Sequence, residues 1–153
     1  MNLFRWLLPI AFSREPDFIV GGLKNPYLKR WFVIPRNRFF NIYLHHFLRS
    51  DDDRALHDHS YSSISIILRG SYVEHTIAAG GIHHRQQLSE GQIKIRLSGA
   101  FAHRIEVDKP CWTLFITGPR YREWGFHCAD RGWVAWQDFT NPDNPGETGR
   151  GCD

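Results

Sequence analysis

Short stretches of alternating apolar and polar residues fill the chain between residues 30 and 140. Alternation with a period of two places every second side chain on one face of an extended strand. Gly, Pro and Asp, which favour turns, separate the stretches, as in Asp108-Lys109-Pro110 and Gly118-Pro119. The predicted strands are 30–34, 39–48, a strand that ends at Gly70, 72–77, 92–97, 103–107, 112–117 and 133–139. Many short strands with almost no helical periodicity predict an all-β fold, a small β-barrel or jelly roll.

The predicted strand 39–48 carries apolar residues on both faces, so we expect both of its faces to be covered. Its neighbouring residues His45 and His46 point to opposite faces of the strand, so at most one of them can approach a given site. Neither is favoured as a metal ligand.

The two ends of the chain are predicted to lie outside the central domain. Residues 1–29 contain too many Pro and Gly residues for a long helix, which indicates an irregular N-terminal arm that begins with a short helix or arm packed on the domain. Residues 141–153 are rich in Pro, Gly and charge, and we expect a flexible C-terminal tail. The remaining residues, 30–140, form one domain of ordinary size.

Charge, the length of apolar runs and cysteine content limit which partners and which cell compartment are expected for the chain. The 153 residues carry 19 Lys and Arg against 16 Asp and Glu, and this net charge of +3 is too small to indicate a nucleic-acid partner. No apolar run reaches the length of a membrane span, so no membrane association is expected. Three scattered cysteines, Cys111, Cys128 and Cys152, contain no CxxC pair and argue against a disulfide framework. They favour a reducing compartment, and the predicted location is cytoplasmic.

Three histidines form the candidate metal site. His57 and His59 are two residues apart, so both side chains project from the same face of an extended segment. His103, in the segment 99–105, is the best candidate for a third ligand. Neutral imidazole binds divalent transition metals, and three neutral ligands leave the charge of the metal uncompensated, which favours an anionic substrate. Asp58 points the opposite way and is expected to accept hydrogen bonds away from the metal. The alternative is a surface pair of histidines with no metal.

The order of these motifs resembles the cupin family. The first motif of that family is HxH followed by a strand and a glycine, matched by Gly70; the second opens with a glycine, matched by Gly91, and supplies one more histidine. The resemblance covers residues 30–119 and implies a single cupin (jelly-roll) β-barrel. The Glu ligand that is usual in the family falls on Ser63 or Ile64, so that carboxylate is missing. Glu74, on the next strand, is the alternative ligand.

Cupins without that Glu include the thiol dioxygenases. The chain resembles them in Phe40-Asn41-Ile42, in Glu74 and in His103-Arg104-Ile105-Glu106. This resemblance implies a non-haem metal-dependent oxygenase that acts on a small anionic substrate and uses Fe²⁺, with Zn²⁺, Ni²⁺ and Mn²⁺ as alternatives. It also implies that Arg30 binds the substrate carboxylate, with Arg36 as its rival.

One part of the machinery of the thiol dioxygenases is missing from the chain. Their Ser-His-Tyr relay corresponds here to Thr113, Phe115 and Thr117, and a phenylalanine can neither pass a proton nor donate a hydrogen bond. We therefore expect little or no activity on free cysteine.

Other hydroxyl groups have to carry protons if the chain is an oxygenase. Tyr61 and Tyr72 are the catalytic candidates, and Ser63 and Ser65 are the candidates for substrate binding, because a regular strand would place Tyr61 and both serines on the histidine face. Two other functions stay open at this point: a non-catalytic cupin that binds a small ligand or a protein partner, and a metal-dependent isomerase or lyase.

Overall fold

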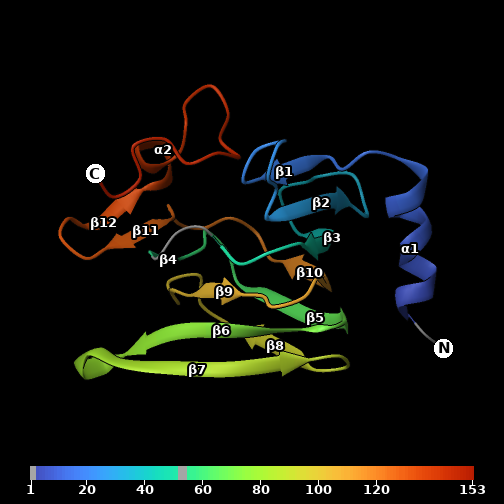
Figure 1. Ribbon diagram of the computed structural model, residues 1–153, viewed down its shortest axis with the longest axis horizontal. Helices are drawn as coiled ribbons and strands as arrows, with labels where there is room; N and C mark the ends of the chain where they lie inside the picture. Colours follow the sequence, from blue (N-terminus) through green and yellow to red (C-terminus); the bar gives the residue numbers. More distant parts are fainter. Residues whose placement is uncertain (1–2, 52–54) are drawn as a thin grey trace.

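The computed structural model describes residues 3–51 and 55–153, and its strands form antiparallel sheets around a common interior (Figure 1). The largest sheet has six strands, and every neighbouring pair in it is antiparallel. In spatial order these strands are β1 (Phe18–Val20), β2 (Leu28–Phe32), β3 (Asn41–Phe47), β10 (Cys111–Thr117), β5 (Ser63–Arg69) and β8 (Ile93–Arg96).

Two three-stranded sheets make up the opposite layer. One has the order β12 (Gly132–Ala135), β11 (Gly125–Cys128) and β4 (Leu56–His57); the other has the order β7 (Ile82–Ser89), β6 (Ser71–Ala78) and β9 (Arg104–Glu106). The backbones of His57 and His103 join them, because each N–H donates to the other's carbonyl oxygen at 2.8 and 2.9 Å. Two of the predicted metal ligands therefore lie where the two halves of this layer meet.

The arrangement is an open jelly-roll sandwich, which corrects the expectation of a closed barrel. Within the described residues, the edge strands β1 and β8 of the large sheet pair on one side only. They contain three and four residues, and such short edge strands offer few unpaired backbone groups to another chain. The all-β class itself is confirmed.

Most of the predicted strands are present, with ends shifted by a few residues. The sequence analysis did not predict β1, β7 or β11, and the stretch 133–139 divides into β12 and a single helical turn, α2 (Trp136–Phe139). The turn expected at 78–81 contains the short 3₁₀ segment η1 (Ala79–Gly81) between β6 and β7. Strand β7 was missed because six consecutive residues from its start are exposed, so it lacks the alternation that marks a half-buried strand.

A core of apolar side chains from both layers fills the interior. Burial of each such side chain contributes about 1.5–3 kcal/mol, and this holds the two layers together. The buried members are Leu28, Phe47, Ile67, Tyr72, Leu88, Ile105, Val107 and Cys111.

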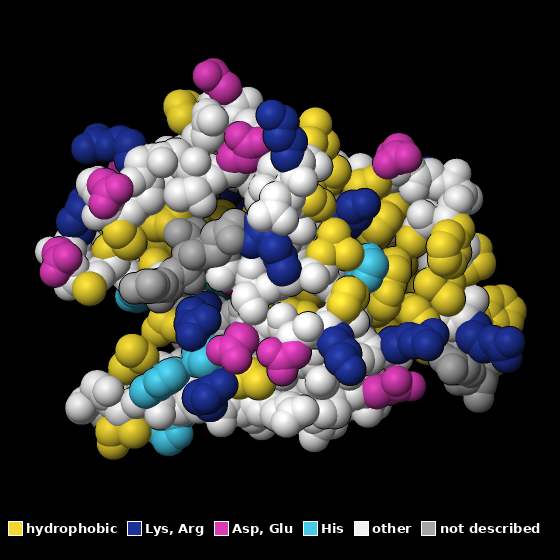
Figure 2. All heavy atoms as spheres, viewed as in Figure 1, with side chains coloured by type: hydrophobic (Ala, Val, Ile, Leu, Met, Phe, Trp, Pro, Cys, Tyr) yellow, Lys and Arg dark blue, Asp and Glu magenta, His cyan; other side chains and the backbone are white. Residues whose placement is uncertain are grey.

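The N-terminal segment is more ordered than the predicted irregular arm, whose residues 1–2 lie outside the described part. Its helix α1 (Leu3–Ser13) covers the outer face of the large sheet, where Phe4 and Leu7 pack with Leu44 of β3. Strand β3 is therefore covered on both faces, as predicted. Figure 2 shows apolar side chains over α1, and Trp6 and Phe12 are 71% and 81% exposed. Among the described residues, no helix combines the length and apolar character needed to cross a membrane.

Strand β8 reverses the usual assignment of its two faces. Ile93 and Ile95 are 58% and 59% exposed, whereas Arg96 is buried at 7%. Buried Arg96 donates a hydrogen bond to the carboxylate of Glu74, which is itself buried. A buried carboxylate needs a cationic partner, and this requirement decides which face of β8 turns inward.

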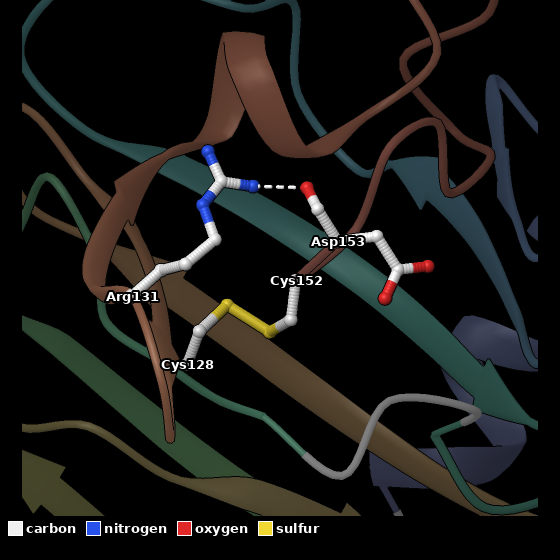
Figure 3. Close-up of a disulfide and its surroundings, with 4 residues drawn as sticks. All are labelled: Cys128, Arg131, Cys152 and Asp153. Atoms are coloured by element: carbon white, nitrogen blue, oxygen red, sulfur yellow. Dashed lines mark hydrogen bonds between the residues drawn. A yellow bond between two sulfur atoms is a disulfide. The ribbon is translucent and has the colours of Figure 1, made fainter.

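The C-terminal segment is attached to the domain, which corrects the expectation of a flexible tail. Cys128 of β11 forms a disulfide with Cys152, and Arg131 donates to the carbonyl oxygen of Asp153 (Figure 3). The N–H of Gly21 donates to the carbonyl oxygen of Gly146 at 2.7 Å. The prediction that the cysteines form no disulfide is wrong, because only the fold brings residues 24 positions apart within bonding distance. Disulfides are rare in reducing compartments, so the cysteines no longer favour a cytoplasmic location.

Candidate metal centre

His57, His59 and His103 come together as the sequence predicts. One nitrogen from each lies within 4.8 Å of the other two, and Nε2 of His59 is 2.9 Å from Nε2 of His103. Two nitrogens that bind one metal at about 2.0–2.1 Å and at right angles lie about 3 Å apart, so this spacing fits shared coordination. Strand β4 ends at His57, and a hydrogen bond from His59 N–H to the carbonyl oxygen of Gly99, at 2.8 Å, continues the extended path.

Glu74 lies behind His103 and does not join the cluster as a ligand atom. Its Oε1 accepts a hydrogen bond from His103 Nδ1 at 2.6 Å. A carboxylate can only accept here, so Nδ1 carries the proton and Nε2 presents its lone pair to the site. Lys94 and Arg96 of β8 pair with the same carboxylate, and the sequence analysis missed both. The alternation of β8 places Lys94 and Arg96 on one face but does not show that this face turns inward, so the sequence alone could not assign them to the site.

Burial keeps all three imidazoles neutral, which is the form that binds metal. It lowers the pKa of His57 to about 4 and holds the pKa values of His59 and His103 well below the usual 6.5. The neighbouring imidazoles and the guanidinium of Arg96 lower the latter two further. The carboxylate of Asp51 lies 3.6 Å from Nδ1 of His57.

Asp58 points away from the cluster, as expected. It is 1% exposed and accepts hydrogen bonds from the N–H of Gly125 at 2.8 Å, from Arg122 at 3.2 Å and from the indole of Trp133 at 3.1 Å. These contacts fix the β11–β12 hairpin beside β4. Asp58 therefore stabilises the segment that carries His57 and His59.

A cavity of about 670 Å³ opens beside the cluster, and His57 and His59 line it. Arg30 and Tyr61 line the same cavity, so the structure brings these two predicted residues to the site. The Nε of Arg30 donates to Nε2 of His45 at 2.8 Å, and its charge lowers the pKa of His59 in addition to the larger effect of burial. Three further arginines border the cavity, namely Arg36, Arg38 and Arg120.

Ser63, Ser65 and Tyr72 are buried in the strands and are not among the residues that line the cavity. Tyr72 belongs to the core between the layers. Their roles in catalysis and substrate binding stay predictions.

His45 is a buried residue near the site that the sequence analysis did not favour. Its ring stacks on Phe115, with the centroids 5.2 Å apart, and Phe115 lies 6.2 Å from both the ring of His59 and the ring of Tyr61. The apolar ring of Phe115 thus lies between the rings of His45 and His59.

Several solved structures share this arrangement of strands. A cupin superfamily protein from Desulfitobacterium hafniense aligns over 72% of this chain and 88% of its own, with 14% identity and a TM-score of 0.52. FeII HppE aligns over 69% of this chain and 56% of its own, with 13% identity and a TM-score of 0.52. The fold resembles that of a cupin superfamily protein. The Bacillus subtilis oxalate decarboxylase with Mn(II) centres aligns over 75% of this chain and 30% of its own, with 17% identity and a TM-score of 0.53.

At such identities the likeness to these structures shows the fold alone. Neither a family model nor a curated protein matches the sequence. None of the three structures is described as a thiol dioxygenase, so that closer resemblance stays a prediction.

Proposed function

We propose that this cupin is a metal-dependent oxygenase that acts on an anionic molecule. The observation that supports it best is the convergence of three neutral histidine nitrogens beside an arginine-lined cavity. A redox-active ion such as Fe²⁺ would supply Lewis acidity and electron transfer to dioxygen. That the D. hafniense cupin, FeII HppE and the Mn(II) oxalate decarboxylase share the fold supports metal chemistry without choosing the reaction.

The residues of the chain have separate tasks in this proposal. His57, His59 and His103 hold the ion, and Glu74 keeps the correct tautomer on His103. Arg30 binds the anionic group of the substrate, since a guanidinium matches a carboxylate in charge and shape. Burial raises the pKa of Tyr61, so its phenol stays protonated and donates a hydrogen bond to the substrate.

A second function is supported by one distance. The 2.9 Å between Nε2 of His59 and Nε2 of His103 also fits a direct hydrogen bond between two imidazoles. In that case the cavity would bind an anionic ligand without metal and without turnover.

Metal analysis and oxygen uptake separate the two functions. The purified protein is loaded with Fe²⁺, and oxygen uptake is followed with cysteine, other small thiols and 2-oxo acids. The proposal expects one ion per chain and oxygen-dependent turnover of an anion other than cysteine, because Phe115 cannot serve as a proton relay. A His57→Ala, His103→Ala variant is the control, and it should lose both the bound ion and the oxygen-dependent turnover. Absence of metal and of turnover would support the binding protein instead.

A further inference from the structure

The cavity is much larger than the small anion predicted from the sequence requires. Its volume of about 670 Å³ equals that of about twenty water molecules at about 30 Å³ each. A two- or three-carbon acid beside the histidines would leave most of this space to water in contact with aromatic side chains, which is unfavourable. The size of the cavity therefore indicates a longer ligand with an apolar part.

One region of the cavity suits an anion. Within the described ranges, neither Arg30 nor Arg36 forms an ion pair; their guanidinium groups lie over the rings of Tyr43 and Phe32, at 5.0 and 5.6 Å. Tyr61 lines the same cavity, and its phenol O–H can donate to an anion held by these arginines. Two cations without a protein counter-ion and one phenol donor form a site for a carboxylate.

Another region of the cavity suits a flat ring. Trp124 and Trp136 line it with their rings nearly parallel, 6° apart in plane and 5.9 Å apart at the centroids. The Nε1–H of Trp136 is buried and has no hydrogen-bond partner among the residues that the structure describes. A buried donor without an acceptor is costly, and the indole of a buried Trp usually has one. Because Nε1 is shielded from the cavity, a ligand supplies the missing acceptor when the indole of Trp136, which lines the cavity, turns toward it.

We propose that the cavity binds an aryl carboxylate: its carboxylate at Arg30 and Tyr61, and its ring, which bears a hydrogen-bond acceptor, against Trp124 and Trp136. This inference rests on the proposed function, because it assigns the substrate class of the same cavity. Both recognition elements are required. The arginines select the charge, and the tryptophans select the ring and its acceptor.

Four probes separate these elements in binding titrations of the full chain. They are 3-(4-hydroxyphenyl)propanoate, 3-phenylpropanoate, propanoate and the uncharged 3-(4-hydroxyphenyl)propanamide. We expect the first probe to bind most tightly, the second about fivefold more weakly for want of one hydrogen bond, and the last two at least about tenfold more weakly. Calorimetry gives the affinities, and no variant is needed for this comparison.

Variants then assign the elements to residues. Trp136→Phe keeps a ring but removes the hydrogen-bond donor. It should weaken binding of the hydroxylated acid about fivefold and binding of 3-phenylpropanoate less than twofold. Arg30→Gln should weaken both ring acids about tenfold or more and leave the amide unchanged. Trp6→Phe, on the exposed face of α1, is the matched control and should change nothing.

The outcomes distinguish this inference from the proposed function when each titration is run with a chelator and again with Fe²⁺. Selective binding of the hydroxylated acid in protein that takes up no metal supports the aryl carboxylate site and contradicts the oxygenase. Metal uptake together with equal binding of propanoate and the ring acids overturns the aryl carboxylate site and leaves the oxygenase standing. An equal loss of affinity for both ring acids in Trp136→Phe would also overturn the aryl carboxylate site.

Discussion

Two histidine pairs in this molecule have almost the same local geometry. Nε2 of His59 lies 2.9 Å from Nε2 of His103, whose other nitrogen donates to Glu74 at 2.6 Å. On the β6–β7 hairpin, Nδ1 of His75 lies 2.9 Å from Nε2 of His83, and the other nitrogen of His75 is 2.7 Å from Glu106. Figure 2 shows histidine, basic and acidic side chains gathered over this second region.

The surroundings of the two pairs differ. The first pair has a third nitrogen, from His57, within reach, and none of the described residues offers such a third ligand atom to the second pair. A guanidinium nitrogen lies 3.4 Å from a ring nitrogen in both pairs. Arg104 is beside Nδ1 of His75, the nitrogen that faces His83, whereas Arg96 is beside Nδ1 of His103, which faces Glu74 and not His59. Spacing, a supporting carboxylate and a nearby cation are therefore shared features, and the third nitrogen of His57 is what distinguishes the first pair.

Removing ligands should give the largest contrast between the pairs. We expect His57→Ala with His103→Ala to lower affinity for Fe²⁺ or Zn²⁺ by more than about 100-fold, which exceeds the usual effect of losing an outer partner. His75→Ala with His83→Ala should leave one ion per chain. Elemental analysis and competition with a chelator measure both. Equal metal loss in the two double variants would show that the pairs are equivalent.

Changing the carboxylates should give the next largest contrast. Glu74→Gln replaces the charged acceptor behind His103 with a neutral amide, and the weaker hydrogen bond should lower metal affinity about 10–100-fold. It also leaves buried Arg96 without its counter-charge, so unfolding free energy should fall by about 3–5 kcal/mol. Glu106→Gln, on a half-exposed residue, should change neither quantity appreciably. Unchanged metal affinity in a folded Glu74→Gln protein would contradict the role given to Glu74.

The cavity beside His57 and His59 is partly closed by the C-terminal segment, because residues 145–148 line it. The disulfide attaches this segment to β11, so reducing it tests how the segment is held. Opening the bond between Cys128 and Cys152, which are 24 positions apart, should cost about 3 kcal/mol of unfolding free energy. Calorimetry with and without a dithiol reductant measures the loss, and Cys152→Ser should no longer respond to reductant. If the melting temperature of the wild type does not change with the reductant, the C-terminal segment is held by contacts other than the disulfide.

A histidine outside both pairs provides the smallest effect and a reference for acid sensitivity. Burial, with a smaller contribution from Lys29, lowers the pKa of His46 to about 4. The unfolded chain binds this proton below pH 6.5, so stability falls as pH drops from 6.5 to about 4 and changes little below that. The slope is at most about 1.4 kcal/mol per pH unit, and smaller for a partly exposed group.

Denaturation of His46→Gln across that range should show a flatter profile than the wild type. Metal content at pH 7 should be unaffected by this change, since His46 belongs to neither pair. A profile as steep as that of the wild type would assign the acid sensitivity to other groups.

The sequence alone was enough to predict the fold class and the convergence of His57, His59 and His103. Period-two alternation reports which residues extend and which faces are apolar, so β3, β5, β6 and β10 were predictable. The His57–His59 spacing fixes a shared face over only two residues, and backbone geometry alone guarantees it.

Only the tertiary structure decided what lies behind and beside those ligands. The inward turn of Arg96 depends on Glu74 from a different sheet, and the Cys128–Cys152 bond depends on where the C-terminal segment ends. The local pattern of β8 says that its faces differ but not which one turns inward. The same limit applies to His75 and His83: their pairing and the proximity of Arg104 are set by strand register, which joins residues that the sequence keeps apart.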